Sequence, residues 1–383
     1  MPIGPTARYL VLTVAAGHGH VRAAESLALA LRHRGGEVTV VDAVRHANPV
    51  LGRALIGAYL ETLRLGPGLW RFLYQLAALD DTCAWAQRGF GRWSSLVAAP
   101  KLVSLIAQTR PDALICTHPF PLGTLSHLRE RGLIPPTPCV AVVTDLGFHP
   151  FWIWPGTARY ALAHQGLRRS FQQWGVARTQ LVTTGIPVSP AFLRLPPAAE
   201  ARKALGLEPG LPVVMVMCGG LGMGPLAEVV RRLDEGACDC QLLVVTGMNT
   251  RLARDLAARH WRQRVAIVGY VQETAALMAA ASLLVSKPGG LTASEALAAG
   301  LPMVMVSPLP GQEEANAVQL KRWGVGVCAS TPTEAARLAR ELLADEAALS
   351  RMRCRVNAVR RPDAAQVLAG RIEQMVRAGG RRR

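Results

Sequence analysis

The chain has 383 residues, a length typical of two domains, and half of its residues are hydrophobic, enough for a core in each. Its formal net charge of +17 favours an anionic partner such as an acidic membrane or a phosphorylated substrate. The eight cysteines show no zinc-site spacing and no apolar run reaches the roughly 20 residues of a transmembrane helix, so a zinc domain and a membrane-spanning protein are not expected.

Short apolar segments recur along the whole chain and are continuous rather than alternating, as in strands of a parallel sheet covered on both faces. They lie at 9–14, 38–42, 113–117, 139–144, 160–163 and 180–183, and then at 213–218, 241–246, 265–268, 283–286 and 303–306. Amphipathic segments between them have the spacing of helices, for example 21–33, 226–233 and 274–281. This alternation predicts an α/β protein with two parallel sheets.

A proline-rich segment separates the two halves and is typical of a linker. We predict a first domain at 1–186, a linker at 187–211, a second domain at 212–360 and a basic tail at 361–383. Ligands of open α/β sheets bind beyond the carboxyl ends of the strands, so we expect the chemistry in a cleft between the domains. The arginine-rich tail is expected either to hold an acidic lipid surface or to be solvated.

Residues 48–110 interrupt the strand–helix pattern with apolar and aromatic side chains, Trp70 among them, next to several arginines. This composition is typical of helices that lie in a membrane interface, and the alternative is a helical insert packed on its own sheet. We favour contact with a membrane lipid, which predicts a cytoplasmic protein bound peripherally to the inner face of the membrane.

Two strand-end loops in the first half carry candidate catalytic residues. The first strand is followed by Gly19 and His20 at the start of a helix, where backbone N–H groups are open to an anion or a hydroxyl. The strand at 139–144 is followed by Asp145 and His149, a carboxylate and an imidazole suited to general-base catalysis.

Two loops in the second half have the composition of phosphate sites. Gly219, Gly220 and Gly222 follow the strand at 213–218 and allow a ligand to approach the backbone closely. The second loop precedes a helix whose N-terminus favours a diphosphate, and Glu295 one turn later suits a ribose diol. Its candidate residues are Lys287, Gly289, Gly290, Thr292 and Glu295.

A third polar loop follows the strand at 303–306 and contains Gln312, Glu313 and Asn316, all potential partners of sugar hydroxyls. The chain has no Asp-x-Asp pair, which metal-dependent sugar-nucleotide enzymes often use. We therefore expect no cofactor and no metal ion, with the diphosphate charge met by helix ends and basic side chains.

These motifs together resemble the GT-B glycosyltransferases of the monogalactosyldiacylglycerol synthase and processive diacylglycerol glucosyltransferase group (family 28-like), and more distantly the lipid II GlcNAc transferase. The resemblance runs along nearly the whole chain. Its motifs are 286–295, Gly300-Leu301-Pro302, 310–316, 219–224, Gly19-His20 with Ala23-Ala24, Thr144-Asp145 with His149 and Trp152, and Gly185-Ile186-Pro187-Val188. The implied fold is two Rossmann-like domains whose parallel sheets face a central cleft.

The resemblance implies an inverting enzyme that moves a hexose from a UDP-sugar to a membrane lipid such as diacylglycerol. It implies that Tyr270 and Val271 border the uracil and that Gly19, Phe148 and Trp152 bind the acceptor. Trp70 is a fourth candidate for acceptor binding. His20, Asp145 and His149 remain the candidate bases. Transfer of GlcNAc to another lipid-linked acceptor and epimerisation of a UDP-sugar are the alternative activities. Nucleic-acid binding is not expected, because no known module interleaves aromatic with basic residues here.

Overall fold

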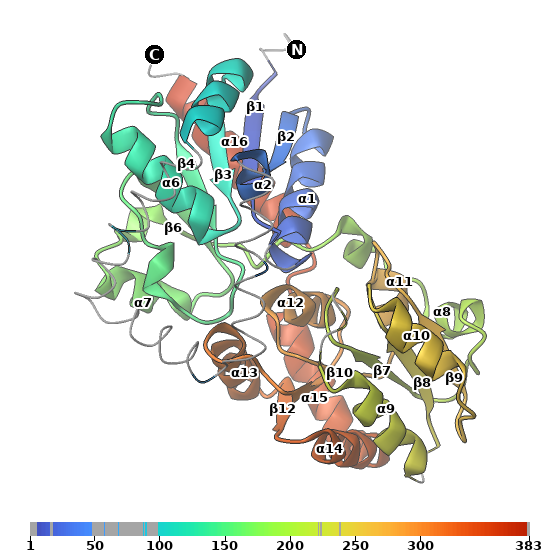
Figure 1. Cartoon of the computed structure of the whole chain (residues 1–383). Helices are drawn as coiled ribbons and strands as arrows, with labels where there is room; N and C mark the ends of the chain where they lie inside the picture. The colour runs from blue at the N-terminus through green and yellow to red at the C-terminus, as the bar shows by residue number, and fades with distance from the viewer. Residues whose placement is uncertain are drawn as a thin grey trace. The chain divides into compact units, whose positions relative to one another are not determined.

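In the computed structural model, residues 6–15, 18–47, 57, 68, 87, 89, 99–220, 222, 224–236 and 239–380 are described. Most of the predicted insert at 48–110, including Trp70, lies outside these residues. The chain forms two compact units, 1–188 with 363–383 and 189–362 (Figure 1). The described part of each unit contains one six-stranded parallel sheet, which confirms the predicted α/β class with two parallel sheets.

The sheet of the first unit has the strand order β2-β1-β3-β4-β5-β6. Its central strands β1, β3 and β4 are buried on both faces, which explains their continuous apolar sequences. In chain order the elements of this unit are β1 (Arg8–Thr13), α1 (His18–His33), β2 (Glu37–Asp42), α2 (Ala43–Ala47), β3 (Ala113–Cys116), α6 (Pro119–Glu130), β4 (Cys139–Val142), η1 (Pro150–Trp152), β5 (Thr157–Leu162), α7 (Leu167–Gln173), η2 (Arg178–Gln180), β6 (Leu181–Thr183) and, after the second unit, α16 (Ala364–Gly380).

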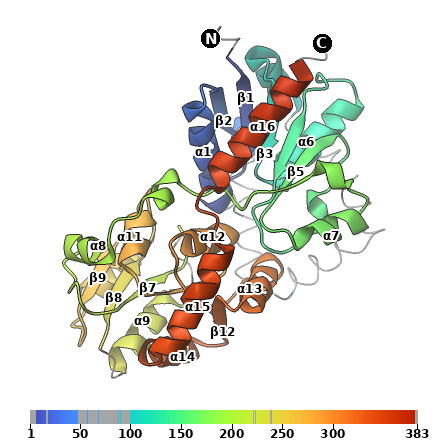
Figure 2. The same cartoon turned by 180° about the vertical axis from the view of Figure 1, so that it is seen from behind.

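Helix α16 belongs to the first unit, whereas the sequence analysis expected a basic tail at 361–383 and a second domain ending at 360. Ala365, Leu368, Ala369 and Ile372 are spaced as one face of a helix and are buried in one core cluster with α1 and the sheet. Figure 2 shows α16 crossing this face of the sheet beside α1. Burial of Leu368 and Ile372 stabilises this docking by about 1.5–3 kcal/mol each.

The sheet of the second unit has the order β12-β11-β10-β7-β8-β9. Its core consists of the buried strand residues and the apolar faces of α9 and α14. In chain order the elements are η3 (Pro190–Leu193), α8 (Ala198–Ala204), β7 (Val213–Met217), α9 (Leu226–Glu235), β8 (Gln241–Val245), α10 (Thr250–Ala257), β9 (Val265–Val268), α11 (Ala275–Ala280), β10 (Leu283–Ser286), α12 (Gly290–Ala298), β11 (Met303–Val306), α13 (Gln312–Trp323), β12 (Gly326–Ala329), α14 (Pro332–Ala344) and α15 (Glu346–Val359).

Among the described helices, none combines the length and the apolar composition needed to cross a membrane.

Candidate functional site

The strand order of the first sheet changes direction between β1 and β3, since β2 lies on the far side of β1. Ligands of open α/β sheets bind beyond the carboxyl ends of the strands at such a switch point. His20 lies in the first turn of α1, directly after β1, and Thr117 and His118 directly follow β3. The switch point therefore brings together two histidines from parts of the sequence almost 100 residues apart.

The hydrogen bonds of His20 fix its tautomer. Its Nδ1 lies 2.9 Å from the carbonyl oxygen of Thr117 and 2.8 Å from Oγ1 of Thr144. A carbonyl oxygen only accepts, so Nδ1 carries the proton and donates it. The Thr144 hydroxyl accepts the same proton and donates to the Thr117 carbonyl at 3.4 Å. Neutral His20 therefore keeps its lone pair on Nε2.

Burial lowers the pKa of His20 to about 4, and the Thr117 carbonyl opposes part of this shift. An imidazole removed from water loses the hydration that stabilises its cation, so the neutral form is favoured. At neutral pH, His20 is therefore an uncharged ring with an unprotonated Nε2, which is the form that a general base requires.

His118 is a candidate residue that the sequence analysis missed. Its Nδ1 accepts a hydrogen bond of 3.0 Å from the backbone N–H of Phe120 and caps α6, so the neutral ring carries its proton on Nε2. The rings of His118 and His20 meet edge to face with their centroids 4.6 Å apart. Burial, and then repulsion by the charge that His20 carries when it is protonated, lower the pKa of His118 well below its usual value.

The sequence signal for His118 is the repeated motif His-Pro-Phe, which occurs at 118–120 and at 149–151. In the second copy, Nδ1 of His149 accepts a 3.2 Å hydrogen bond from the N–H of Phe151 and caps η1. Neutral His149 therefore has its proton on Nε2, whereas neutral His20 has an unprotonated Nε2 that can act as a base. Asp145, the third predicted base, is half-buried and directly follows Thr144.

The predicted acceptor residues of the first unit have different surroundings. Gly19 precedes His20 in the first turn of α1. Phe148 is half-buried and packs edge to face against Phe171, with ring centroids 5.1 Å apart. Trp152 was expected to contact the acceptor, but it is only 2% exposed because it lies in the core, so it supports the loop from within.

The switch point of the second sheet lies between β7 and β10, whose following loops are the two predicted phosphate loops. Gly219 and Gly222 have φ values of +69° and +60°, a region that favours glycine. A Cβ on Gly222 would lie 2.1 Å from the carbonyl oxygen of Thr246, whereas one on Gly219 would meet nothing within 4 Å. Gly220 accepts a hydrogen bond from the N–H of Met248 through its carbonyl oxygen.

Charged side chains from two neighbouring loops lie near the thiol of Cys218, which directly follows β7. Burial raises its pKa to about 11, while the positive charge of Lys287 lowers it and the negative charge of Glu313 raises it further. Lys287 also lies against the glycine loop, since a Cβ on Gly224 would be 2.9 Å from its Cε. The switch point therefore combines a glycine-rich loop with an amine and a carboxylate.

The loop after β10 leads into α12, whose N-cap is Gly289 and whose first residue is Gly290. Thr292 lies in the same first turn and is half-buried. The first N–H groups of a helix have no partner inside the helix, and the helix dipole favours negative charge there. Together with Lys287, these groups form a site suited to a diphosphate.

Helix α13 contributes its first turn to the same region. Gln312 is half-buried, and Glu313 accepts a 2.6 Å hydrogen bond from the N–H of Leu309 through Oε2. Oε1 of Glu313 would lie 3.9 Å from a Cβ on Gly289, so this carboxylate is next to the start of α12.

Two of the predicted donor residues are buried. Asn316 is 0% exposed, and its amide donates a 3.0 Å hydrogen bond to the carbonyl oxygen of Pro288. It was expected to contact the sugar, but its amide is used to hold the loop before α12. Glu295 is 5% exposed, so little of it is open to a ribose.

Tyr270 and Val271 follow β9, the strand at the edge of this sheet. Tyr270 is 46% exposed, and Val271 is partly buried. Among the described residues, no group of three or more His, Cys, Asp or Glu side chains is placed to hold a metal ion.

Comparison with known proteins identifies both halves of the chain. Residues 20–188 match the family model of monogalactosyldiacylglycerol (MGDG) synthase, and residues 213–367 match that of the glycosyltransferase family 28 C-terminal domain. The chain is 28% identical to the processive diacylglycerol beta-glucosyltransferase of Bacillus subtilis (strain 168) over 372 residues, covering 94% of this chain and 93% of the relative. The enzyme of the same name from Staphylococcus carnosus (strain TM300) is 29% identical over 353 residues, with coverages of 90% and 87%.

The fold is similar to that of MurG from Acinetobacter baumannii, with a TM-score of 0.59 and 17% identity over 96% of this chain and 99% of MurG. The two six-stranded parallel sheets thus correspond to the GT-B fold predicted from the sequence. The chain belongs to the sugar-transferring enzymes that join an MGDG synthase domain to a glycosyltransferase family 28 C-terminal domain.

Proposed function

We propose that this enzyme transfers a hexose from a UDP-sugar to the hydroxyl of a membrane lipid such as diacylglycerol, with inversion at the anomeric carbon. The names of its relatives support a diacylglycerol acceptor. The observation that carries the proposal is the state of His20, a neutral imidazole with an unprotonated Nε2 beyond the carboxyl end of β1.

In the proposed reaction, Nε2 of His20 takes the proton of the lipid hydroxyl while the hydroxyl oxygen attacks the anomeric carbon. The bond between this carbon and the UDP oxygen breaks in the same step, and UDP leaves with the bonding electrons. Because a base of pKa about 4 is weak, proton transfer accompanies attack instead of preceding it. The Thr117 carbonyl stabilises the imidazolium through its hydrogen bond to Nδ1. Asp145, next to Thr144, is the second candidate for the general base.

We further propose that the diphosphate binds at the start of α12, with Lys287 and the N–H groups around Gly290 opposing its charge. This arrangement stabilises the leaving group through a helix N-terminus and a cation, so no metal ion is required. Gln312 and Glu313 would contact the sugar hydroxyls, and Tyr270 would border the uracil.

We also propose that the enzyme acts as a peripheral protein on the cytoplasmic face of the membrane. The excess of basic over acidic residues supports attraction to an anionic surface. The aromatic and basic composition of residues 48–110 supports lipid contact there.

The test is incubation with a panel of UDP-sugars and membrane lipids, with products identified by mass spectrometry. We expect a glycosylated diacylglycerol. If another lipid is glycosylated and diacylglycerol is not, that lipid is the acceptor. Conversion of the UDP-sugar without lipid would identify an epimerase instead. One variant then tests the base: His20→Asn should lose turnover and keep UDP binding. Equal activity of His20→Asn and wild type would move the role to Asp145.

A further inference from the structure

The two histidines at the switch point of the first sheet differ in the state of Nε2. In neutral His20 this atom carries a lone pair, because Nδ1 donates its proton to the carbonyl oxygen of Thr117. In neutral His118 it carries the proton, because Nδ1 accepts a hydrogen bond from the N–H of Phe120. Residues 117–120 connect β3 to the first turn of α6, so one short segment sets opposite tautomers in the two rings.

Both Nε2 atoms are accessible to a ligand. The rings of His20 and His118 lie edge to face with their centroids 4.6 Å apart, and each side chain is half-buried. Within the described part of the chain, neither Nε2 has a hydrogen-bond partner, and neither is among the unpartnered polar atoms that the protein encloses completely. A hydrogen-bond acceptor and a hydrogen-bond donor are therefore available side by side.

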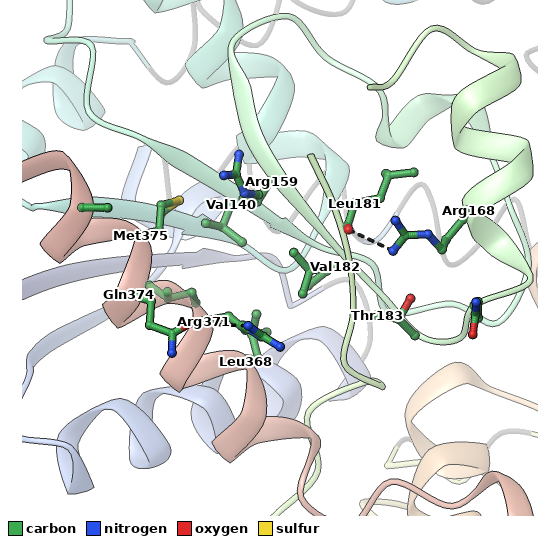
Figure 3. Close-up of a pocket in the computed structure, with 14 residues that line it drawn as sticks. Val140, Arg159, Arg168, Leu181, Val182, Thr183, Leu368, Arg371, Gln374 and Met375 are labelled. Carbon is green, nitrogen blue, oxygen red and sulfur yellow. Dashed lines mark hydrogen bonds between the residues drawn. The ribbon is translucent and has the colours of Figure 1, made fainter. Parts of the chain in front are cut away.

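This pair lies at the edge of the sheet where the strands end. A groove beside α16 is lined by residues near the starts of strands, such as Arg159 in β5 and Leu181 in β6 (Figure 3). Because the paired strands of this sheet are parallel, their starts and their ends lie at opposite edges. His20 and His118 follow the ends of β1 and β3, so a ligand that contacts both occupies the candidate acceptor site and not this groove.

His118 can donate a hydrogen bond to a ligand but is not suited to take a proton from one. The lone pair on its Nδ1 is used by the N–H of Phe120 in the cap of α6. Burial, and then the charge of protonated His20, oppose a positively charged His118. Of the two rings, His20 is therefore the one that can act as a base, and His118 offers an N–H.

The N–H of His118 is best matched by an oxygen next to the attacking hydroxyl. In the proposed reaction, the acceptor hydroxyl gives its proton to Nε2 of His20 while its oxygen attacks the sugar. A hydrogen bond donated to that same oxygen would withdraw electron density from the attacking atom and oppose its activation. In a diacylglycerol with a terminal hydroxyl, the neighbouring carbon carries an ester group, whose oxygens accept hydrogen bonds.

We propose that His118 binds the acceptor by donating from Nε2 to the ester group beside the attacking hydroxyl, so that His20 and His118 together select lipids with an oxygen on the carbon next to the hydroxyl-bearing carbon. This inference rests on the proposed function, because it uses the hydroxyl that His20 deprotonates. It adds a specificity to that function. A lipid that lacks this oxygen leaves the N–H of His118 without a partner when it binds, and is therefore a poorer substrate.

The first test compares two acceptors with the wild-type enzyme, each diluted in vesicles of phosphatidylcholine. One is dioleoylglycerol with a terminal hydroxyl, and the other is an analogue in which an alkyl chain of equal length replaces the ester on the middle carbon. We expect kcat/KM to be about tenfold higher for dioleoylglycerol. Equal values would overturn this inference and leave the proposed function standing, whereas no transfer to either acceptor would contradict both.

The decisive variant is His118→Asn. The amide oxygen of asparagine can still accept from the N–H of Phe120 and cap α6, but the shorter side chain no longer places an N–H at the position of Nε2. We expect kcat/KM for dioleoylglycerol to fall about tenfold, through a higher KM for the acceptor, and kcat/KM for the analogue to stay unchanged. An equal fall for both acceptors, or a higher KM for the UDP-sugar alone, would overturn the inference.

The matched control is His127→Asn, the same substitution in the last turn of α6. It should retain the wild-type preference between the two acceptors, and loss of that preference would show that Nε2 of His118 is not its source. Urea unfolding should give similar free energies of unfolding for His118→Asn and wild type, because the cap of α6 is kept. If His118→Asn does not fold, the comparison of the two acceptors with the wild type still decides.

Discussion

The pH dependence of folding provides a direct test of the state of His20. Burial lowers its pKa to about 4, whereas in the unfolded chain the pKa is about 6.5. Between these two values the unfolded chain binds the proton and the folded protein does not. Stability therefore falls as the pH falls from 6.5 to 4, and this group contributes no pH dependence above that range.

The size of this effect follows from the two pKa values. At pH 5, unfolded His20 is almost fully protonated and folded His20 is about one-tenth protonated, so the unfolded state gains about 2 kcal/mol relative to pH 8. His20→Asn removes the titrating ring, while its side-chain amide can still donate to the Thr117 carbonyl. The variant should lack this contribution at every pH.

Urea unfolding of both proteins at pH 8 and pH 5 measures the difference. The free energy of unfolding of the wild type should fall by about 2 kcal/mol more than that of His20→Asn over this interval. Titration of groups that do not contact His20 affects both proteins and cancels in the comparison. An equal fall would show that His20 is not held neutral by burial, and would remove the basis for its role as a neutral base.

Further predictions concern the reaction and the second unit. His20→Asn should reduce turnover by about 10²–10⁴-fold, the usual contribution of a general base, with UDP affinity by calorimetry unchanged. Gly222→Ala should destabilise the loop and weaken UDP binding, because its Cβ would meet the Thr246 carbonyl at 2.1 Å. The control Gly219→Ala has a similar φ but open space around its Cβ, so it should cost only the roughly 1–2 kcal/mol of backbone strain. Asn316→Ala should lower the free energy of unfolding by about 1–3 kcal/mol, because the Pro288 carbonyl loses its buried partner. Sugar transfer should continue in the presence of EDTA, and its complete loss, restored by a divalent cation, would contradict the proposed binding of the diphosphate.

The architecture was largely readable from the sequence because both sheets are parallel and their central strands are buried. Strands such as Val265–Val268 and Met303–Val306 are continuous apolar segments, and the structure has them at their predicted bounds. Strand β12 was not among the predicted strands because it is only four residues long, and Gly324 and Gly326 interrupt the apolar residues around it. The apolar stripe of α16 was visible in the sequence, but the neighbouring arginines suggested a tail, and only tertiary packing shows where the stripe docks.

The sequence was sufficient to predict which loops form the candidate site, but not which side chains in them contact one another. Glycine-rich turns after strands identified 219–224 and 286–290, because the carboxyl ends of parallel strands meet at one edge of a sheet. Burial depends on the packing of distant segments, so the sequence could not show that Trp152 and Asn316 are enclosed. His118 was missed because its importance comes from the strand order, which places β3 beside β1 and its histidine against His20.

The two switch points differ in their electrostatics, and this difference fits the two halves of a sugar transfer. In the first unit, burial lowers the pKa values of His20 and His118, so both rings are neutral at physiological pH and suited to a neutral hydroxyl. In the second unit, Lys287 and the start of α12 present positive charge, suited to a diphosphate. An anionic donor is attracted by Lys287 and the start of α12, and not by the neutral rings of His20 and His118. The uncharged state of His20 therefore provides a base without creating a competing site for the diphosphate.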